Sequence, residues 1–198
     1  MLRVGVTGGI GAGKSLVCRV FEALGVPIYT ADERAKWLLN HDLALKAAVR
    51  QLLGSEAYLP DGQYHRNWVA SQVFQNPDLL QQLNALVHPR VKEDTIAWVN
   101  QHSLKPYIIK EAAIMDKPNA QNQLDCVVVV HAPVALRVAR VRQRDPHRSE
   151  KEILDIIARQ QPDTDRLAIA DYIVYNDETQ LLLPQIWLLH QKFINLKY

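Results

Sequence analysis

The feature that most constrains the fold of this chain is a glycine-rich stretch near its start, Gly8–Ser15, which reads GGIGAGKS. It matches the pattern G-x-x-x-x-G-K followed by Ser or Thr. A short β-branched run at 2–7 precedes it and predicts a buried strand, and an apolar pattern at 14–24 predicts a helix after it. Glycines let backbone N–H groups approach a polyphosphate, and a helix N-terminus favours anions. The stretch therefore predicts a nucleotide-phosphate site.

Two side chains of this stretch add chemistry to the backbone. Lys14 would bring a positive charge to the β- and γ-phosphates, and Ser15 would offer its hydroxyl to Mg²⁺. An ordinary glycine-rich turn between a strand and a helix has no need for Lys-Ser at the helix start. The pair therefore favours ATP with Mg²⁺ as the bound group.

The remaining apolar runs predict a parallel sheet interrupted by a helical block. Short β-branched runs predict four more strands, at 26–29, 107–110, 127–131 and 172–175. Apolar residues three and four apart predict helices within 32–53 and 66–103, with a turn at 58–62, and a closing helix at 179–196. We expect an α/β fold of the P-loop NTPase class, with three α/β/α layers and a parallel five-stranded sheet.

This pattern divides the chain into three parts. The nucleotide-binding core would comprise 1–31, 104–143 and 162–198, the helical domain 32–103, and a lid over the phosphates 144–161. Such a lid would exclude water, which competes with an acceptor hydroxyl for the phosphoryl group.

Composition limits the class of protein. A chain of 198 residues with 48% hydrophobic and 22% charged residues is an ordinary globular protein, large enough for a core without disulfides. Its net charge of +2 does not favour a nucleic-acid partner. We expect Cys18 and Cys126 to be buried thiols, which fits a cytoplasmic location. No stretch is apolar enough to span a membrane, so we expect no membrane association. We expect the protein to be a monomer.

Four arginines recur at spacings of three, four and four residues after Pro133. On one continuous helix they would form a single stripe: Arg137, Arg140, Arg144 and Arg148. A second face, with Val134, Val138 and Val141, would point to the core. Guanidinium groups match phosphate oxygens, so we predict that at least one of Arg140, Arg144 and Arg148 contacts the phosphates of ATP. The alternative is a solvated face paired with Asp145, Glu150 and Glu152.

Asp32 follows the second predicted strand, at the edge of the sheet where the phosphate loop also opens. A carboxylate there can accept the proton of an acceptor hydroxyl. The alternative is a helix-capping role, because Thr30–Glu33 resembles a capping box.

A guanine-specific switch would carry Asn-Lys-x-Asp after a late strand, which this chain lacks. The sequence therefore fits a small-molecule kinase better than such a switch.

Several segments together carry a family resemblance. They are VGVTGGIGAGKS at 4–15, ADERA at 31–35, LNALVHP at 83–89, QRD at 143–145 and ADYIVYN at 170–176. In this order and spacing, the chain resembles the dephospho-CoA kinase family. The resemblance implies transfer of the γ-phosphate of ATP to the ribose 3′-hydroxyl of dephospho-CoA, the last step of coenzyme A synthesis. It also implies that the helical domain binds the CoA moiety.

The resemblance assigns roles residue by residue. The catalytic residues would be Asp32, Lys14 and Arg140, and the substrate would contact Thr7, Asp32 and His88. Ser15 would hold the metal. The nucleotide would contact Gly9, Gly11, Ala12, Gly13, Lys14, Ser15, Leu16, Arg144 and Asn176. Two positions depart from the family pattern: Thr30 stands where an aspartate is common, and Lys117 stands where a glutamate is common.

Two other functions compete with this one. Another small-molecule P-loop kinase, such as a nucleoside or nucleotide kinase, would share Lys14 and Ser15 but not the segment at 83–89. A nucleotide-dependent switch would bind nucleotide without needing Asp32. Aromatic residues of the helical block either stack on the adenine of the substrate or fill the core: Tyr58, Tyr64, Trp68 and Trp98.

Overall fold

The computed structural model describes residues 1–74, 76–119 and 121–196. The chain divides into two compact units, one formed by Met1–Thr30 with His102–Tyr198 and the other by Ala31–Gln101. The second unit covers nearly the same stretch as the helical domain expected at 32–103.

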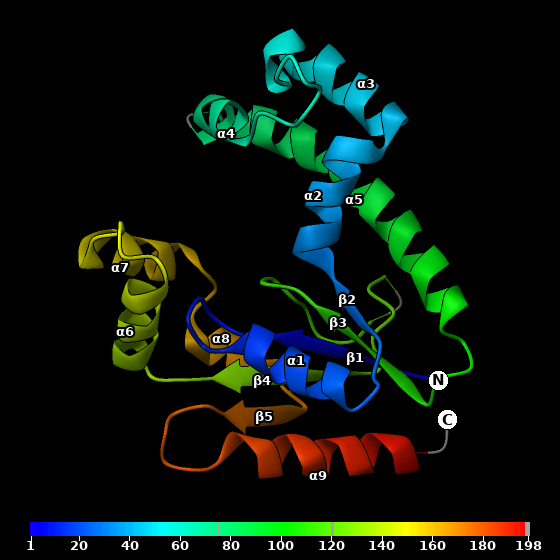
Figure 1. The fold of residues 1–198 in the computed structure, drawn as a ribbon, viewed down its shortest axis with the longest axis vertical. Helices are drawn as coiled ribbons and strands as arrows, with labels where there is room; N and C mark the ends of the chain where they lie inside the picture. Colours follow the sequence, from blue (N-terminus) through cyan, green and yellow to red (C-terminus); the bar gives the residue numbers. More distant parts are fainter. Residues whose placement is uncertain (75, 120, 197–198) are drawn as a thin grey trace. The chain divides into compact units, whose positions relative to one another are not determined.

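The first unit contains a sheet of five parallel strands in the order β2-β3-β1-β4-β5 (Figure 1). The parallel pairing confirms the predicted sheet. The second strand begins at Ile28 instead of the predicted residue 26, and the residue before it is Pro27, which has no N–H to donate to a ladder. The strands are β1 (Leu2–Thr7), β2 (Ile28–Thr30), β3 (Tyr107–Glu111), β4 (Cys126–His131) and β5 (Tyr172–Tyr175).

Apolar groups cover both faces of this sheet, which explains the run of valines in β4. Val128 and Val130 pack with helices α1 (Lys14–Ala23) and α9 (Leu182–Asn195) in the larger core. Val127 and Val129 point to the opposite face, where they pack with Met115 and with residues of α8 (Asp163–Ala168). The sheet therefore lies between two layers, as the expected α/β/α arrangement requires.

Helices α6 (Val134–Arg144) and α7 (Glu150–Arg159) complete the first unit. Val138 and Val141 are buried as predicted, but Val134 is 40% exposed, so its predicted place in the core is wrong. Val134 is the first residue of α6, directly after the N-cap Pro133, where no preceding turn covers it. Helix α8 was not predicted, and the closing helix begins at Leu182 instead of residue 179.

The second unit is helical and has a core of its own. Leu45, Val49 and Leu83 are buried in it, and it does not share the core of the sheet. The predicted turn at 58–62 is present, with Leu59 N–H donating to the Gln63 carbonyl at 2.8 Å. The elements are α2 (Ala31–His41), α3 (Leu43–Leu53), the 3₁₀ turn η1 (Ser55–Ala57), α4 (Arg66–Phe74) and α5 (Pro77–Gln101).

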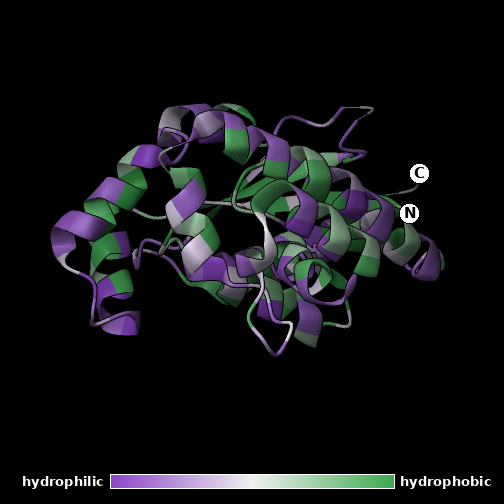
Figure 2. Ribbon diagram, turned by 90° about the horizontal axis from the view of Figure 1, so that it is seen from above, coloured by the Kyte–Doolittle hydropathy of each residue, from purple (hydrophilic) through white to green (hydrophobic). Residues whose placement is uncertain are grey.

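The distribution of hydrophobic residues along the helices agrees with the packing of one helix face against a core. Helices carry hydrophilic and hydrophobic residues side by side along their length, as amphipathic helices do (Figure 2). Among the described residues, no helix is long and apolar enough to cross a membrane. Both cysteines are buried thiols, as predicted, and burial raises the pKa of Cys18 and of Cys126 to about 12.

Candidate functional site: the phosphate loop and its supports

The phosphate loop joins the carboxyl end of β1 to the N-terminus of α1. Gly13 is the N-cap of α1 and has φ 99°, in the left-handed region that glycine adopts without strain. The Lys14 Nζ donates to the Gly8 carbonyl at 2.9 Å, so the lysine side chain folds back over the loop. A cavity of about 340 Å³ opens here, lined by Gly9, Ile10, Gly11, Gly13, Lys14, Ser15, Ala113, Arg140, Val141, Arg144 and Gln160.

Two loop glycines are required because other side chains come very close to them. A Cβ on Gly9 would lie 1.9 Å from the Arg137 Nη1, and a Cβ on Gly13 would lie 2.2 Å from the Asn176 Nδ2. Both distances are far below van der Waals contact. The glycines therefore serve the packing of the loop against its supports as well as its exposure to a ligand.

Asn176 and Arg140 hold the second half of the loop. The Asn176 Nδ2 donates to the Ala12 carbonyl at 2.9 Å. The Arg140 Nη1 donates to the Asn176 carbonyl at 2.9 Å, and its Nη2 pairs with Glu178 at 3.1 Å. Arg140 thus lines the cavity and also fixes the segment that carries Asn176, and its contact with the phosphates of ATP stays a prediction.

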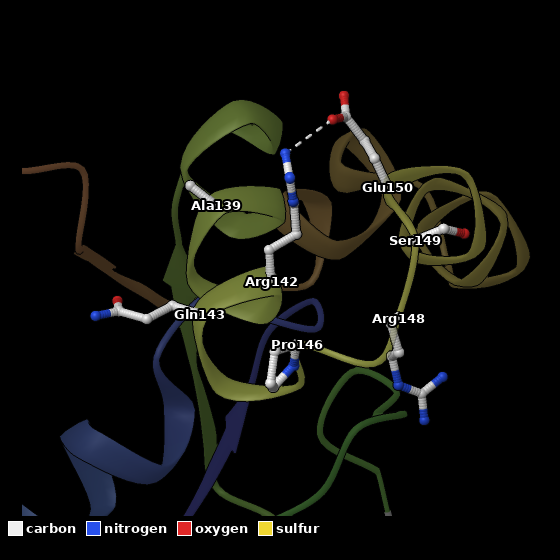
Figure 3. Close-up of a pocket in the computed structure, with 7 residues that line it drawn as sticks. All are labelled: Ala139, Arg142, Gln143, Pro146, Arg148, Ser149 and Glu150. Carbon is white, nitrogen blue, oxygen red and sulfur yellow. Dashed lines mark hydrogen bonds and ion pairs between the residues drawn. The ribbon is translucent and has the colours of Figure 1, made fainter.

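The predicted arginine stripe ends at Arg144, the first residue of the expected lid. Helix α6 stops at Arg144 with Asp145 as its C-cap, so Arg148 lies outside the helix and does not continue the stripe. Arg144 lines the phosphate cavity and pairs with Asp145 at 2.8 Å, whereas Arg148 lines a different hollow, of about 720 Å³, between α6 and α7 (Figure 3). In that hollow Arg142 pairs with Glu150 at 3.3 Å.

Arg137 lies on the same helix as Arg140 and Arg144 but is buried. It is only 2% exposed, and its Nη1 pairs with Asp163 at 3.1 Å. The same carboxylate oxygen accepts from the buried Arg166, which also donates to the Gln161 carbonyl at 2.7 Å. Burial lowers the pKa of Arg166, and the charge of Arg137 lowers it further. Arg137 therefore shares α6 with Arg140 and Arg144, as the spacing predicts, but it is buried next to Gly9 of the loop and does not line the cavity.

Three residues outside the loop line the cavity without having been predicted as site residues: Ala113, Val141 and Gln160. Gln160 lines the cavity, and its Oε1 accepts from the Ile10 N–H at 2.9 Å, across 150 residues of sequence. Glu111 carries a buried carboxyl at the end of β3, where it pairs in register with Val6 of β1. Burial is the main cause of the raised pKa of Cys18, and the charge of Glu111 raises this pKa further. No local pattern marks Gln160 or Glu111, because both act through contacts distant in sequence.

The other predicted site residues lie as follows. Ser15 is exposed and borders the cavity, and Leu16 is 44% exposed. Thr7 is buried, and its hydroxyl donates to the Ala113 carbonyl at 3.3 Å. The hydroxyl is thus engaged within the fold, and a substrate contact for Thr7 stays a prediction. The described part of the chain contains no group of three or more His, Cys, Asp or Glu residues that could hold a metal ion.

Asp32 and His88 belong to the second unit. Asp32 is an exposed residue in the first turn of α2, two residues after the end of β2. His88 is exposed on α5 and precedes Pro89, which lies inside that helix. Next to it, Arg90 donates to Asp42, the residue that caps α3, at 2.7 Å.

The aromatic residues of the second unit mainly fill its core. Tyr58 is 5% exposed, packs edge-on against Tyr64 at 5.7 Å, and donates to the Leu39 carbonyl at 3.0 Å. Burial raises its pKa to about 12. Trp68 packs against the same core and also borders a hollow of about 750 Å³ with Arg50 and His65.

The parallel sheet, the glycine loop and Lys-Ser at the start of α1 define a P-loop kinase fold. Solved structures share it. A crystal structure from Thermus thermophilus superimposes with a TM-score of 0.82, at 24% identity over 100% of this chain and 98% of that one. The dephospho-CoA kinase from Campylobacter jejuni gives a TM-score of 0.70, at 21% identity over 96% of each chain.

Sequence relationships then identify the family. The family model described as "Dephospho-CoA kinase" matches residues 2–181, and this chain belongs to the dephospho-CoA kinase family. Similar curated proteins carry the same name. The one from Porphyromonas gingivalis is 36% identical over 94% of this chain and 91% of its own length. The one from Bacteroides fragilis is 34% identical over 93% of this chain and 89% of its own length. The chain is thus a kinase, a transferase that acts on an alcohol group.

Proposed function

We propose that this chain transfers the γ-phosphate of ATP to the ribose 3′-hydroxyl of dephospho-CoA, giving CoA and ADP. The observation that carries the proposal is the family match over residues 2–181, which includes both the phosphate loop and the helical unit. A nucleoside or nucleotide kinase would account for the loop but not for the segment at 83–89 within that match.

The first unit would bind and neutralise the phosphates. Backbone N–H groups of the loop and the N-terminus of α1 favour a polyphosphate, and Lys14 adds its charge. Arg140 and Arg144 line the same cavity, so their guanidinium groups are available to the charge that develops on the transferring phosphoryl group. For Arg144 this means exchanging or sharing its present partner, Asp145.

Asp32 would accept the proton of the acceptor hydroxyl. It is exposed, and the chain brings it directly from the carboxyl end of β2, the edge at which ligands bind in parallel α/β sheets. A carboxylate in that role takes the proton as the oxygen attacks the γ-phosphorus, and the ADP oxygen leaves with the electron pair of the broken bond.

Mg²⁺ fits the oxygen groups at the loop. The Ser15 hydroxyl borders the cavity, and the Glu111 carboxylate stands at the end of the neighbouring strand. Mg²⁺ is usually held by one or two protein oxygens together with phosphates and water, so a cluster of three acidic residues is not required. When bound, the ion would neutralise phosphate charge, and Ser15 is the residue we assign to hold it.

The remaining assignments extend this proposal to the rest of the molecule. The helical unit would bind the CoA moiety, with His88 on the substrate side, and residues 144–161 would act as a lid. Asn176 and Leu16 would border the nucleotide. Two buried thiols without a disulfide fit a reducing cytoplasm, and we propose a monomer as the working state.

A comparison of acceptors tests the function. The chain would be incubated with ATP, Mg²⁺ and one of dephospho-CoA, adenosine, AMP or shikimate, and ADP release would be followed. We expect release that depends on dephospho-CoA and an equal amount of CoA. If ADP were released only with one of the other acceptors, the chain would still be a kinase, but dephospho-CoA would not be its acceptor.

An Asp32→Ala variant tests the proposed base. We expect kcat to fall by roughly 10²–10⁴-fold with little change in the Kd for ATP, because the carboxylate acts on the acceptor and not on the nucleotide. Glu33→Ala is the matched control, since it removes an exposed carboxylate from the same helical turn. Equal effects of the two substitutions would contradict the assignment.

A further inference from the structure

Gln160 is the one residue of the segment between α7 and α8 that lines the phosphate cavity. Its Oε1 lies 2.9 Å from the Ile10 nitrogen, in the middle of the phosphate loop. Neither the loop pattern nor the arginines account for a neutral carboxamide at this place. The contact joins two segments 150 residues apart, so it is a feature of the folded site and not of local sequence.

The chemistry of this contact fixes which end of the carboxamide faces which group. A backbone N–H can only donate, so the oxygen of Gln160 must face Ile10. The Nε2 group, with its two N–H donors, is then directed away from Ile10, on a side chain that borders the cavity. A carboxamide held in this way offers hydrogen-bond donors to an anion while its acceptor is engaged.

The backbone that carries Gln160 is itself held in place. The next residue, Gln161, accepts from the buried Arg166 through its carbonyl at 2.7 Å. Arg166 shares Asp163 with Arg137, whose guanidinium lies against Gly9. On the other side, Ile10 packs with Ile153 and Ile157 of α7. Polar and apolar contacts thus fix the segment around Gln160 to the first half of the loop.

We propose that Gln160 is a phosphate-binding residue of this site, whose Oε1 is held by the Ile10 N–H while its Nε2 donates to a phosphate oxygen of ATP. The proposal rests on the proposed use of ATP. It adds a neutral donor to the charged groups Lys14, Arg140 and Arg144. It also gives the segment after α7 a direct contact with the nucleotide, through which phosphate binding would order the proposed lid.

Three variants separate this role from a general effect of charge or packing. Gln160→Glu keeps an oxygen for Ile10 but replaces the donor with a negative charge. Gln160→Met keeps the length and removes both polar groups. Gln161→Glu adds the same charge one residue further on, at a position whose described contact is made by its backbone. Binding of a non-hydrolysable ATP analogue with Mg²⁺ would be measured by calorimetry, so that no acceptor is needed.

We expect the Kd of the analogue to rise by about tenfold or more in Gln160→Glu, because a carboxylate near a phosphate is repelled across a partly desolvated cavity. In Gln160→Met it should rise about three- to tenfold, as expected for one lost hydrogen bond to a charged group. In Gln161→Glu it should change less than about twofold, since the half-buried Gln161 does not line the cavity and would place its charge further from the phosphates. Thermal unfolding of Gln160→Glu and Gln161→Glu should match the wild type, whereas Gln160→Met, which leaves the Ile10 N–H without this acceptor, should unfold at a lower temperature.

The outcomes are distinct. A Gln160→Glu protein that binds the analogue within twofold of the wild type overturns the proposal. Equal weakening in Gln160→Glu and Gln161→Glu also overturns it, because the effect would then be general charge repulsion. If the wild type itself binds no ATP analogue, the proposed function fails as well. Normal binding by the wild type without phosphorylation of dephospho-CoA would overturn only the proposed acceptor and leave the role of Gln160 to be decided by its own variants.

Discussion

The phosphate loop and the helical unit are built in opposite ways. The loop consists of small residues, and side chains from distant parts of the sequence hold its backbone: Gln160 contacts Ile10, and Asn176 contacts Ala12. The helical unit instead has an apolar core of its own, and its polar contacts join its own helices, such as Arg34 with Asp94 at 2.9 Å.

This difference has consequences for what a mutation changes. A backbone binding site has few side chains of its own to lose, so its supports determine its shape. A helical unit with a separate core can lose packing without altering the loop. The comparison therefore predicts that substitutions near the loop change nucleotide binding and turnover, whereas core substitutions in the helical unit change stability first.

The largest expected effect is the loss of Lys14. Lys14→Ala removes the positive charge of the loop, and we expect kcat/KM to fall by more than roughly 10³-fold, as for other groups that neutralise a transferring phosphate. A steady-state assay with dephospho-CoA measures this, and thermal unfolding should show the helical unit unaffected. A fully active variant would contradict the assignment of the loop.

A substitution at Gly9 tests whether the supports shape the loop. Gly9→Ala would place a methyl group 1.9 Å from the Arg137 Nη1, on a guanidinium that is buried and held by Asp163. We expect the Kd for an ATP analogue to rise by about 10- to 100-fold, equivalent to about 1.4–2.8 kcal/mol.

A second substitution serves as the control for Gly9→Ala. Arg137→Gln shortens the side chain that meets the new methyl group, so the double variant should recover part of the lost affinity. If the double variant bound no better than Gly9→Ala alone, the clash with Arg137 would not be the cause.

Matched core deletions compare the two units directly. Leu45→Ala, in the core of the helical unit, and Phe21→Ala, on α1 in the core beneath the sheet's phosphate-loop helix, each empty a fully buried site and should each cost about 2–5 kcal/mol of stability. Thermal unfolding measures the loss. At a temperature where both variants remain folded, we expect ATP-analogue affinity to be unchanged in Leu45→Ala and reduced in Phe21→Ala. The reverse order would contradict the separation of the two units.

The smallest expected effect is on the pH dependence of the stability of the helical unit. Burial opposes ionisation of Asp42, but hydrogen bonds from the Leu45 N–H and from Arg90 outweigh it and lower the pKa of this carboxyl. A lowered folded-state pKa stabilises the fold above the unfolded carboxyl pKa of about 3.9, and this stabilisation is lost as the pH falls. Asp42→Ala should cost about 0.5–2 kcal/mol at pH 7, as other lost N-caps do.

A pair of unfolding curves checks this prediction. The difference in stability between the wild type and Asp42→Ala, measured from pH 7 down to pH 3, should shrink as the carboxyl becomes protonated. A difference that stayed constant over this range would show that the ionised carboxylate has no part in capping α3.

The sequence revealed those parts of the fold that depend on local patterns. The strands, the glycine loop and most helices follow from apolar periodicity, glycines and caps. The valines of β4 also indicated a sheet covered on both faces, which the structure confirms. The errors are the short helix α8, which no pattern predicted, and element ends: β2 begins late because Pro27 precedes it, and Val134 is exposed at the first turn of α6.

The site was harder to predict where contacts cross the chain. Lys14, Arg140 and Arg144 line one cavity, and their predicted contacts with the phosphates remain to be tested. Spacing alone suggested that Arg137 and Arg148 would share their stripe. The end of α6 at Arg144 removes Arg148 from it, whereas Arg137 lies on the same helix as Arg140 and Arg144 but is buried beside Asp163. Gln160 could not be found from the sequence, because its importance lies in its contact with Ile10.

The measurement that tests the central claim most directly is the fate of the γ-phosphate, followed by ³¹P NMR in a mixture of the chain, ATP, Mg²⁺ and dephospho-CoA. We predict one phosphate ester on the ribose 3′-hydroxyl for every ADP formed, with no inorganic phosphate, and a product identical to CoA. Inorganic phosphate formed in step with ADP, with dephospho-CoA unchanged, would contradict the account and indicate a nucleotide hydrolase or switch.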